Sequence, residues 1–232
     1  LMPCGEKDAE ATTEFAHSGS KSAKVQGTTD LILPLGNKTT GKYEFSFQLY
    51  IPAGFCGYYN LLQDFNSSTS MYGLEVYFPS NGEGFLNANG YSTATFNYSH
   101  DQWISVKNII DLNNDAAELI IDGETIHGWQ WSAGATGLNG IRQISAGDFF
   151  AGTSEDYPTD IPLYYIDDLE YKALNGPTCE DLEISPGSVS QLLMSNTTAS
   201  RTLTLTNKGN TSHNYNVVLD YASNGWILDS MF

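Results

Sequence analysis

Alternation of apolar and polar residues, interrupted at short intervals by turn residues, runs through most of the 232-residue chain. A period of two residues is typical of β-strands with one buried face, because successive side chains point to opposite faces of a sheet. Clusters of Gly, Asn, Pro, Ser and Asp separate the segments, as at 52–54 and 87–90. We therefore expect antiparallel sheets and no α/β architecture.

A dozen segments before residue 174 have the length and pattern of strands. One pair is joined by Asp122-Gly123, a two-residue turn in which the left-handed backbone favours Gly. So many short strands, with at most one helical turn, predict an all-β sandwich of two antiparallel sheets packed face to face. The expected strands are 22–25, 31–35, 42–51, 57–65, 72–78, 84–88, 93–98, 103–111, 117–121, 124–131, 140–150 and 163–171.

The composition changes at 174–178, where Leu-Asn-Gly-Pro-Thr interrupts the pattern. Beyond this point, 181–185, 201–207 and 214–221 alternate again, as in the beginning of an immunoglobulin-like β-sandwich. Such a domain normally needs seven strands and about 100 residues, and 180–232 is about half that length. We expect a first domain over 1–174, a linker over 175–179 and a partial immunoglobulin-like domain over 180–232, either cut short or completed by strands from elsewhere.

The charge of the chain narrows the classes of partner. Asp and Glu number 27 against 10 Lys and Arg, so the formal net charge is −17. A nucleic-acid binder needs a basic stripe, which is absent. No run of 18 apolar residues occurs in the sequence, so no membrane span is expected. The acidic excess is typical of a solvated surface in a saline exterior, and it argues against sulfated or uronic-acid polymers as ligands unless calcium bridges them.

The cysteines and the glycosylation sequons indicate in which cellular compartment the protein is found. The three cysteines form no Cys-x-x-Cys pair, so a zinc site is not expected. Five Asn-x-Ser/Thr sequons and abundant Tyr, Thr, Ser and Gly favour a secreted or cell-surface protein. If the first and last strands of the sandwich lie side by side, Cys4 and Cys179 come together, and a disulfide there would contribute roughly 4 kcal/mol. Cys56 would then be a free, buried thiol.

Several strings, taken in order, resemble a known group of domains. They are HSGSKSAKV at 17–25, GKYEFSF at 41–47, WISV at 103–106, WQWS at 129–132 and YIDDLEY at 165–171. Over about residues 5–174 the chain is similar to jelly-roll modules of the concanavalin A/laminin-G-like and carbohydrate-binding group, as found in secreted, type IX-exported surface proteins of Bacteroidota. The resemblance implies an antiparallel two-sheet jelly roll that acts in binding or adhesion beside other domains.

The second segment resembles the first half of the immunoglobulin-like spacer domains that follow such modules. Asp229-Ser230-Met231 also fits the short pattern used for O-glycosylation in that phylum, with Ser230 as the modified residue.

The resemblance also implies a structural calcium ion. Ca²⁺ takes six to eight oxygen ligands, and a turn supplies carbonyls while carboxylates balance the charge. Such modules usually begin with a further strand, and this chain starts too late to contain it, so any ligand from that strand is absent or replaced. Because neighbouring strand residues point to opposite faces, we expect only one of Asp167 and Asp168 to face inward. The matching positions are Glu10 or Glu14, Ser20, Lys21 and Asp168.

Four aromatic residues are candidate ligand contacts: Trp129, Trp131, Tyr58 and Tyr59. Sugar sites use exposed aromatic faces beside a few polar groups. Large aromatics also fill sandwich cores, and we expect core packing for at least one of the two tryptophans. The small residues that flank the tryptophans favour an accessible strand end.

Catalysis finds no support in the sequence. A glycosidase of this fold would carry carboxylates that alternate along one strand, whereas Glu118, Asp122 and Glu124 run across a tight turn. The only arginines are Arg142 and Arg201, too few for a lyase cluster, and no Gly-x-Ser-x-Gly elbow exists.

We therefore expect a non-catalytic extracellular module that binds a glycan or a surface protein as part of a larger protein. One alternative is an assembly subunit whose second domain is completed by a partner strand. A second alternative is an ancillary domain of a secreted hydrolase.

Overall fold

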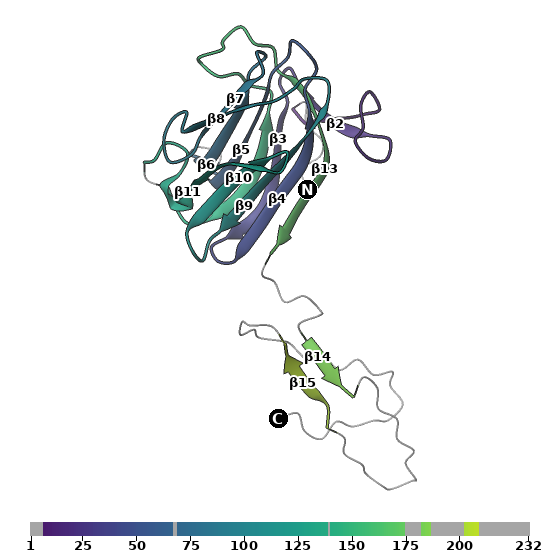
Figure 1. Ribbon diagram of the computed structural model, residues 1–232, viewed down its shortest axis with the longest axis vertical. Helices are drawn as coiled ribbons and strands as arrows, with labels where there is room; N and C mark the ends of the chain where they lie inside the picture. Colours follow the sequence, from purple (N-terminus) through teal and green to yellow (C-terminus); the bar gives the residue numbers. More distant parts are fainter. Residues whose placement is uncertain (1–6, 67–68, 139, 175–181, 187–201, 209–232) are drawn as a thin grey trace. The chain divides into compact units, whose positions relative to one another are not determined.

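The structure is a computed structural model that describes residues 7–66, 69–138, 140–174, 182–186 and 202–208. The chain separates into two compact units, residues 1–175 and 176–232. In the first unit the described residues form thirteen strands and one short 3-10 helix, η1 (Figure 1). They are β1 (Glu10–Thr12), β2 (Ser22–Gln26), β3 (Asp30–Lys38), β4 (Lys42–Tyr50), β5 (Gly57–Asp64), β6 (Met71–Phe78), β7 (Glu83–Asn87), β8 (Ala94–Asn97), β9 (Trp103–Asp111), β10 (Ala116–Ile121), β11 (Glu124–Trp129), η1 (Trp131–Ala133), β12 (Ile144–Phe150) and β13 (Leu163–Ala173).

These strands form two antiparallel sheets that pack face to face, as the sequence pattern predicts. One sheet has seven strands in the order β1-β2-β13-β4-β9-β10-β11, and the other has six in the order β3-β12-β5-β6-β7-β8. Strands from β2 to β5 alternate between the sheets, whereas β5 to β8 follow one another within the six-stranded sheet. The first unit is therefore an all-β jelly-roll sandwich.

Most strand bounds differ from the expected ones by one to four residues, and three of the differences from the expected pattern are informative. β1 was not anticipated, because three residues are too short to show a period. The strand expected over 124–131 ends at Trp129, and Trp131 begins the 3-10 helix instead. The strand expected over 140–150 begins only at Ile144. For β11 and β12 the difference lies at an end of the strand, where alternation is weakest as a signal.

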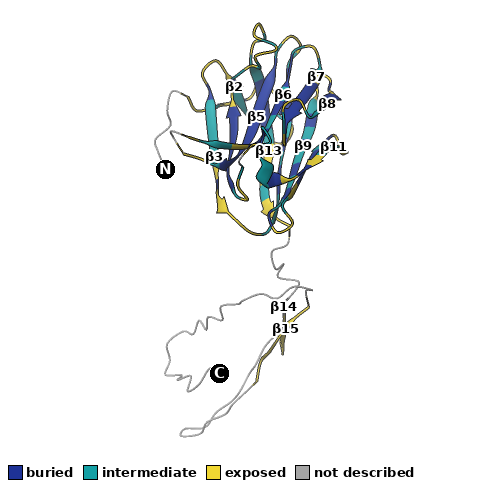
Figure 2. Ribbon diagram, turned by 90° about the vertical axis from the view of Figure 1, so that its left-hand side faces the viewer, coloured by how far each residue is buried: buried dark blue, intermediate teal, exposed yellow. Residues whose placement is uncertain are grey.

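The core lies between the sheets and is rich in aromatic rings. Phe47 packs edge-on against Tyr59 and Phe149, with ring centroids 5.0 and 4.9 Å apart. Trp131 is 0% exposed and lies over Gly73 of β6, where a Cβ atom would come 2.3 Å from the indole ring. Gly73 is thus required by the close approach of the tryptophan, and the buried inner faces are dark blue in Figure 2.

We predict that Gly73→Ala destabilises the protein by about 1–3 kcal/mol, because the added methyl group overpacks the core against Trp131. Chemical denaturation monitored by tryptophan fluorescence measures the change. Gly128→Ala is the matched control, since the nearest atom to its Cβ would be 3.6 Å away, an ordinary contact. Equal stability of the two variants would contradict the packing described here.

The cysteines are only partly described. β2 and β13 pair directly, so an early strand of the first domain and its last strand lie side by side. Cys4 and Cys179, and with them the expected disulfide, lie outside the described residues, as does Ser230. Cys56 is a free, buried thiol, as expected, and burial raises its pKa to about 12.

In the second unit β14 (Leu182–Ser185) pairs antiparallel with β15 (Thr204–Asn207). The third strand expected there, at 214–221, and most of the expected immunoglobulin-like domain lie outside the described residues. No helix in the described part of the chain is both long and apolar enough to cross a membrane.

Candidate functional site

The outer face of the six-stranded sheet is hollowed over β5 and β12. On β5, Tyr59 and Leu61 enter the core, so Tyr58 and Asn60 point to the opposite face. Asn60 is nevertheless only 1% exposed, and Asp148, which points the same way from β12, is 8% exposed. Side chains of the sheet itself therefore bury these outward positions, and they surround a hollow of about 560 Å³.

A row of polar side chains crosses the outer face of the sheet, and two of its members, Asn60 and Asp148, line this hollow. The strand register places Asp148 opposite Asn60, Asn60 opposite Glu75, and Glu75 opposite Asn87. The Asn60 amide donates to Asp148 Oδ2 at 2.7 Å, and Asn87 donates to Glu75 Oε2 at 3.1 Å. These four residues, from four neighbouring strands, are called the polar row below.

A row of aromatic side chains runs beside the polar row, and on each strand the aromatic residue lies two positions from the polar one. Tyr77 lies opposite both Tyr58 and Phe85 in the register. The Tyr58 and Tyr77 ring centroids are 4.8 Å apart, and Phe150 lies edge-on to Tyr58 at 6.4 Å. Phe150, Tyr58, Tyr77 and Phe85 are called the aromatic row below. The Tyr58 and Tyr77 hydroxyls donate to Glu75 Oε1 at 3.1 and 3.0 Å and so connect the two rows.

Two buried oxygen atoms on the floor have no hydrogen-bond partner: Oδ1 of Asp148 and Oδ1 of Asn60. The pKa of Asp148 is raised to about 6: burial is the largest cause, the Asn60 hydrogen bond opposes it, and the charge of Asp30 and a side-chain hydrogen bond with Asp30 add to it. Buried acceptors without donors are costly, so native proteins rarely keep them. Both side chains line the hollow, so a ligand there would lie beside these unpaired acceptors.

The described residues that line this hollow include no Lys, Arg or His. Asp30 and Asp148 contribute carboxyls, while Tyr72 and Phe150 contribute partly exposed rings, Tyr72 being 43% exposed. The site is therefore acidic and aromatic. It suits a ligand with hydroxyl or other hydrogen-bond donors and apolar faces, and it repels a ligand of negative charge.

Of the four aromatic residues expected from the sequence, only Tyr58 lines the hollow. Tyr59, Trp129 and Trp131 are buried members of the core. The expectation of an accessible strand end at the tryptophans is thus wrong, because the chain turns into η1 there and carries Trp131 inward. Asn60, Glu75, Asn87 and Asp148 were not anticipated.

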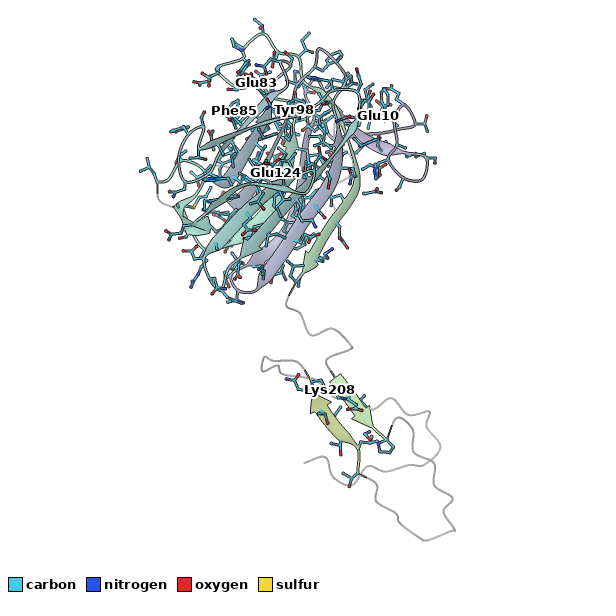
Figure 3. The ribbon with its side chains drawn as sticks, in the orientation of Figure 1. Glu10, Glu83, Phe85, Tyr98, Glu124 and Lys208 are labelled. Atoms are coloured by element: carbon cyan, nitrogen blue, oxygen red, sulfur yellow. The ribbon has the colours of Figure 1, made fainter. Side chains whose placement is uncertain are left out.

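The residues expected around calcium lie near the start of the first domain. Glu10 (Figure 3), Glu14, Ser20 and Lys21 are exposed. Lys24 Nζ donates to both carboxylate oxygens of Glu14 at 2.9 Å. His17 Nδ1 and Ser18 Oγ contact the two oxygens of Asp168, the former at 2.6 Å. The donors around these carboxylates are thus protein groups.

No group of three or more His, Cys, Asp or Glu side chains gathers to hold a metal in the described ranges. Hydrogen bonding to Ser18 and His17 also holds the pKa of Asp168 below its usual value, without a cation. This donor set does not fit a calcium ion as it stands. Calcium binding stays a prediction, which unfolding with and without EDTA tests.

The two neighbouring carboxylates do not divide between the faces of β13 as expected. The pairing of β13 with β4 shifts between Asp167 and Glu170, and Asp168 has φ +46°. Because this irregularity breaks the alternation, both side chains reach the same loop: Asp167 Oδ2 accepts from the backbone N–H groups of His17 and Ser18 at 2.7 and 3.1 Å. The pair anchors residues 17 and 18 to β13.

Comparison with known proteins shows the fold. No protein-family model matches the chain, and a search of the curated proteins finds no match. Among solved structures it is similar to a sialidase, at a TM-score of 0.50 and 14% identity, over 68% of this chain and 16% of the sialidase chain. Two further similar structures are an alginate lyase (TM-score 0.44, 14% identity, 66% of this chain and 80% of that one) and a GH131 beta-glucanase catalytic domain from Podospora anserina (0.43, 12%, 72% and 79%). At such identities the likeness establishes a β-sandwich and nothing finer.

We predict that Asp148→Asn stabilises the protein at pH 7.5. The raised pKa means that the folded state binds a proton more tightly than the unfolded state, so stability falls as pH rises from about 4 to about 6 and stays low above that. Two pKa units correspond to about 3 kcal/mol, and Asn escapes this cost because it cannot ionise.

Thermal unfolding at pH 4 and pH 7.5 measures the effect, with Glu124→Gln, which removes an exposed carboxyl, as the control. The higher Tm of Asp148→Asn should be seen at pH 7.5 and vanish at pH 4. A variant less stable than the parent at pH 7.5 would show that the carboxylate serves the fold.

Proposed function

We propose that the hollow on the six-stranded sheet is a glycan-binding site, and that the chain is a non-catalytic binding module of a larger extracellular protein. One observation carries the proposal. Oδ1 of Asp148 and Oδ1 of Asn60 are buried without a hydrogen-bond donor, on the floor of a hollow walled by aromatic rings.

The chemistry of sugars matches what these groups lack. A pyranose ring offers hydroxyl donors around its edge and C–H groups on its faces, and binding sites pair the faces with aromatic side chains. The unpaired oxygens would accept hydroxyl hydrogens, while Tyr72 and Phe150 would contact ring faces. Since no cationic side chain is found among the described residues that line the hollow, the fitting ligand is an uncharged glycan.

We predict that Tyr72→Ala weakens glycan binding about three- to tenfold, the worth of one aromatic contact of about 0.5–1.5 kcal/mol. Tyr72 is 43% exposed, so its removal costs the fold little. A screen on an array of uncharged glycans first finds a ligand, and isothermal titration calorimetry then compares the variants. Tyr91→Ala is the control, because Tyr91 is 73% exposed and is not among the residues that line this hollow.

Two results would count against the proposal. One is that no uncharged glycan binds at millimolar concentration. The other is that a glycan binds with the same affinity to the parent, the Tyr72 variant and the Tyr91 variant, which would place its site elsewhere. Light scattering on the same sample also tests the assembly alternative, since a stable monomer argues against completion by a partner strand.

A second candidate function is glycan hydrolysis, and the pKa of Asp148 favours it. A glycosidase requires a general acid of raised pKa and a second carboxylate, and Asp148, with a pKa of about 6, has the first property. Glu75 lies two strands away in the polar row, about 10 Å between Cα atoms at the usual strand spacing. An assay for reducing ends released from a bound polysaccharide tests this function. Release that Asp148→Asn abolishes would show that the protein is an enzyme.

A further inference from the structure

A second hollow of about 440 Å³ opens on the same outer face, over β7 and β8. Phe85, labelled in Figure 3, forms part of its wall together with Tyr157. Thr95 and Asn97 of β8 supply hydroxyl and amide groups, and Glu83 and Asp156 supply carboxyls. Its chemistry therefore repeats that of the first hollow: aromatic rings, polar groups and no basic side chain among the described lining residues.

The aromatic row joins the two hollows. Tyr77 lines the first and Phe85 the second, and their rings stack with centroids 4.7 Å apart and planes 9° apart. Beyond them, Phe85 faces Tyr157 at 6.3 Å. Ring contacts therefore follow one another from Phe150 on β12 to Tyr157 at the second hollow.

One segment, residues 151–162, borders both hollows. Gly152 and Thr153 line the first hollow, and Asp156 and Tyr157 line the second. The segment is anchored at its far end, where Asp160 accepts hydrogen bonds from the Ser80 backbone N–H at 2.9 Å and the Ser80 hydroxyl at 2.6 Å. The two hollows therefore share a border, and together they are called the groove below.

We propose that this groove binds an internal stretch of a linear, uncharged polysaccharide, with the two hollows as successive subsites. This inference rests on the proposed function and deepens it. The aromatic row spans four neighbouring strands, about 14 Å at a spacing of about 4.8 Å, and that spacing is close to the rise of one sugar in an extended chain. A glycan lying across the strands would pass from the first hollow into the second and meet aromatic side chains in both.

The charge of the groove selects the polymer class. Asp30 and Asp148 lie in the first hollow, and Glu83 and Asp156 in the second, with no Lys, Arg or His among the described residues that line either. A uronic-acid or sulfated chain would bring like charges close together along its whole length, so the groove favours polymers of neutral sugars.

The experiment is calorimetric titration with cello-, xylo-, manno- and laminari-oligosaccharides of two to six residues. We expect affinity to rise with length for the matching series, because longer chains reach the second hollow. Tyr157→Ala should weaken the hexasaccharide about three- to tenfold and leave the disaccharide unchanged, whereas Tyr72→Ala should weaken every length. Tyr91→Ala is the control for both variants.

Asn97→Ala, at an exposed position of β8, repeats the test should Tyr157→Ala fail to fold. Equal affinity for the disaccharide and the hexasaccharide, with neither second-hollow variant affecting the hexasaccharide, would overturn the extended groove and leave the proposed function standing. Binding of none of the four series, nor of any array glycan, would overturn both. Tighter binding of a polyuronate than of all four neutral series would overturn the inferred polymer class.

Discussion

Two neighbouring inner strands of the six-stranded sheet, β5 and β12, are buried on both faces in a sandwich whose described residues form two layers. Their inner faces meet the core, where Tyr59 and Phe149 pack around Phe47. Within the described part of the chain no third layer covers the outer faces. Large side chains of the same sheet cover them instead, and Figure 2 shows β5 in the colour of buried residues. The walls thus created leave Asn60 and Asp148 away from water, although they point outward.

That geometry has an energetic cost. Two buried oxygens stay without donors, and a carboxyl stays ionised above pH 6 in a poorly solvated place. A fold selected for stability alone would carry apolar or amide side chains there. Unfavourable polar groups collected in a hollow are typical of binding and catalytic sites, where they gain partners when the ligand arrives. The glycan proposal follows from this cost.

Much of the fold is predictable from the sequence, because each strand carries its own signal. Alternation along 103–111 predicts both ends of β9 correctly, and the Asp122-Gly123 turn predicts the hairpin of β10 and β11. The bulge at Asp167 and the turn at Trp131 escape such reasoning. Both are places where tertiary contacts override a period of two, the first through the loop at residues 17 and 18 and the second through Gly73.

The site is less predictable, because it depends on register between strands far apart in sequence. A search for carboxylates that alternate along one strand misses this site, because Asp148, Asn60 and Glu75 come from three different strands. The available signal was a polar residue between apolar neighbours inside a strand, as Asp148 in ISAGDFF and Asn60 in GYYNLLQD. Which such residues would meet is decided by pairing, which the pattern within a strand does not contain.

Because side chains alternate between its two faces, the six-stranded sheet uses different residues for folding and for binding. Inward residues determine whether the chain folds, and outward residues on the same strands determine what the groove accepts, so the two sets can vary with little interference. The outer face can be described as a small grid, in which each strand is a column and each set of residues paired across the strands is a row. Substitutions at its intersections would retune ligand preference while the core remains intact, which makes the module a natural scaffold for selecting new sugar specificities. The intersections of the two rows are positions 58, 60, 75, 77, 85, 87, 148 and 150.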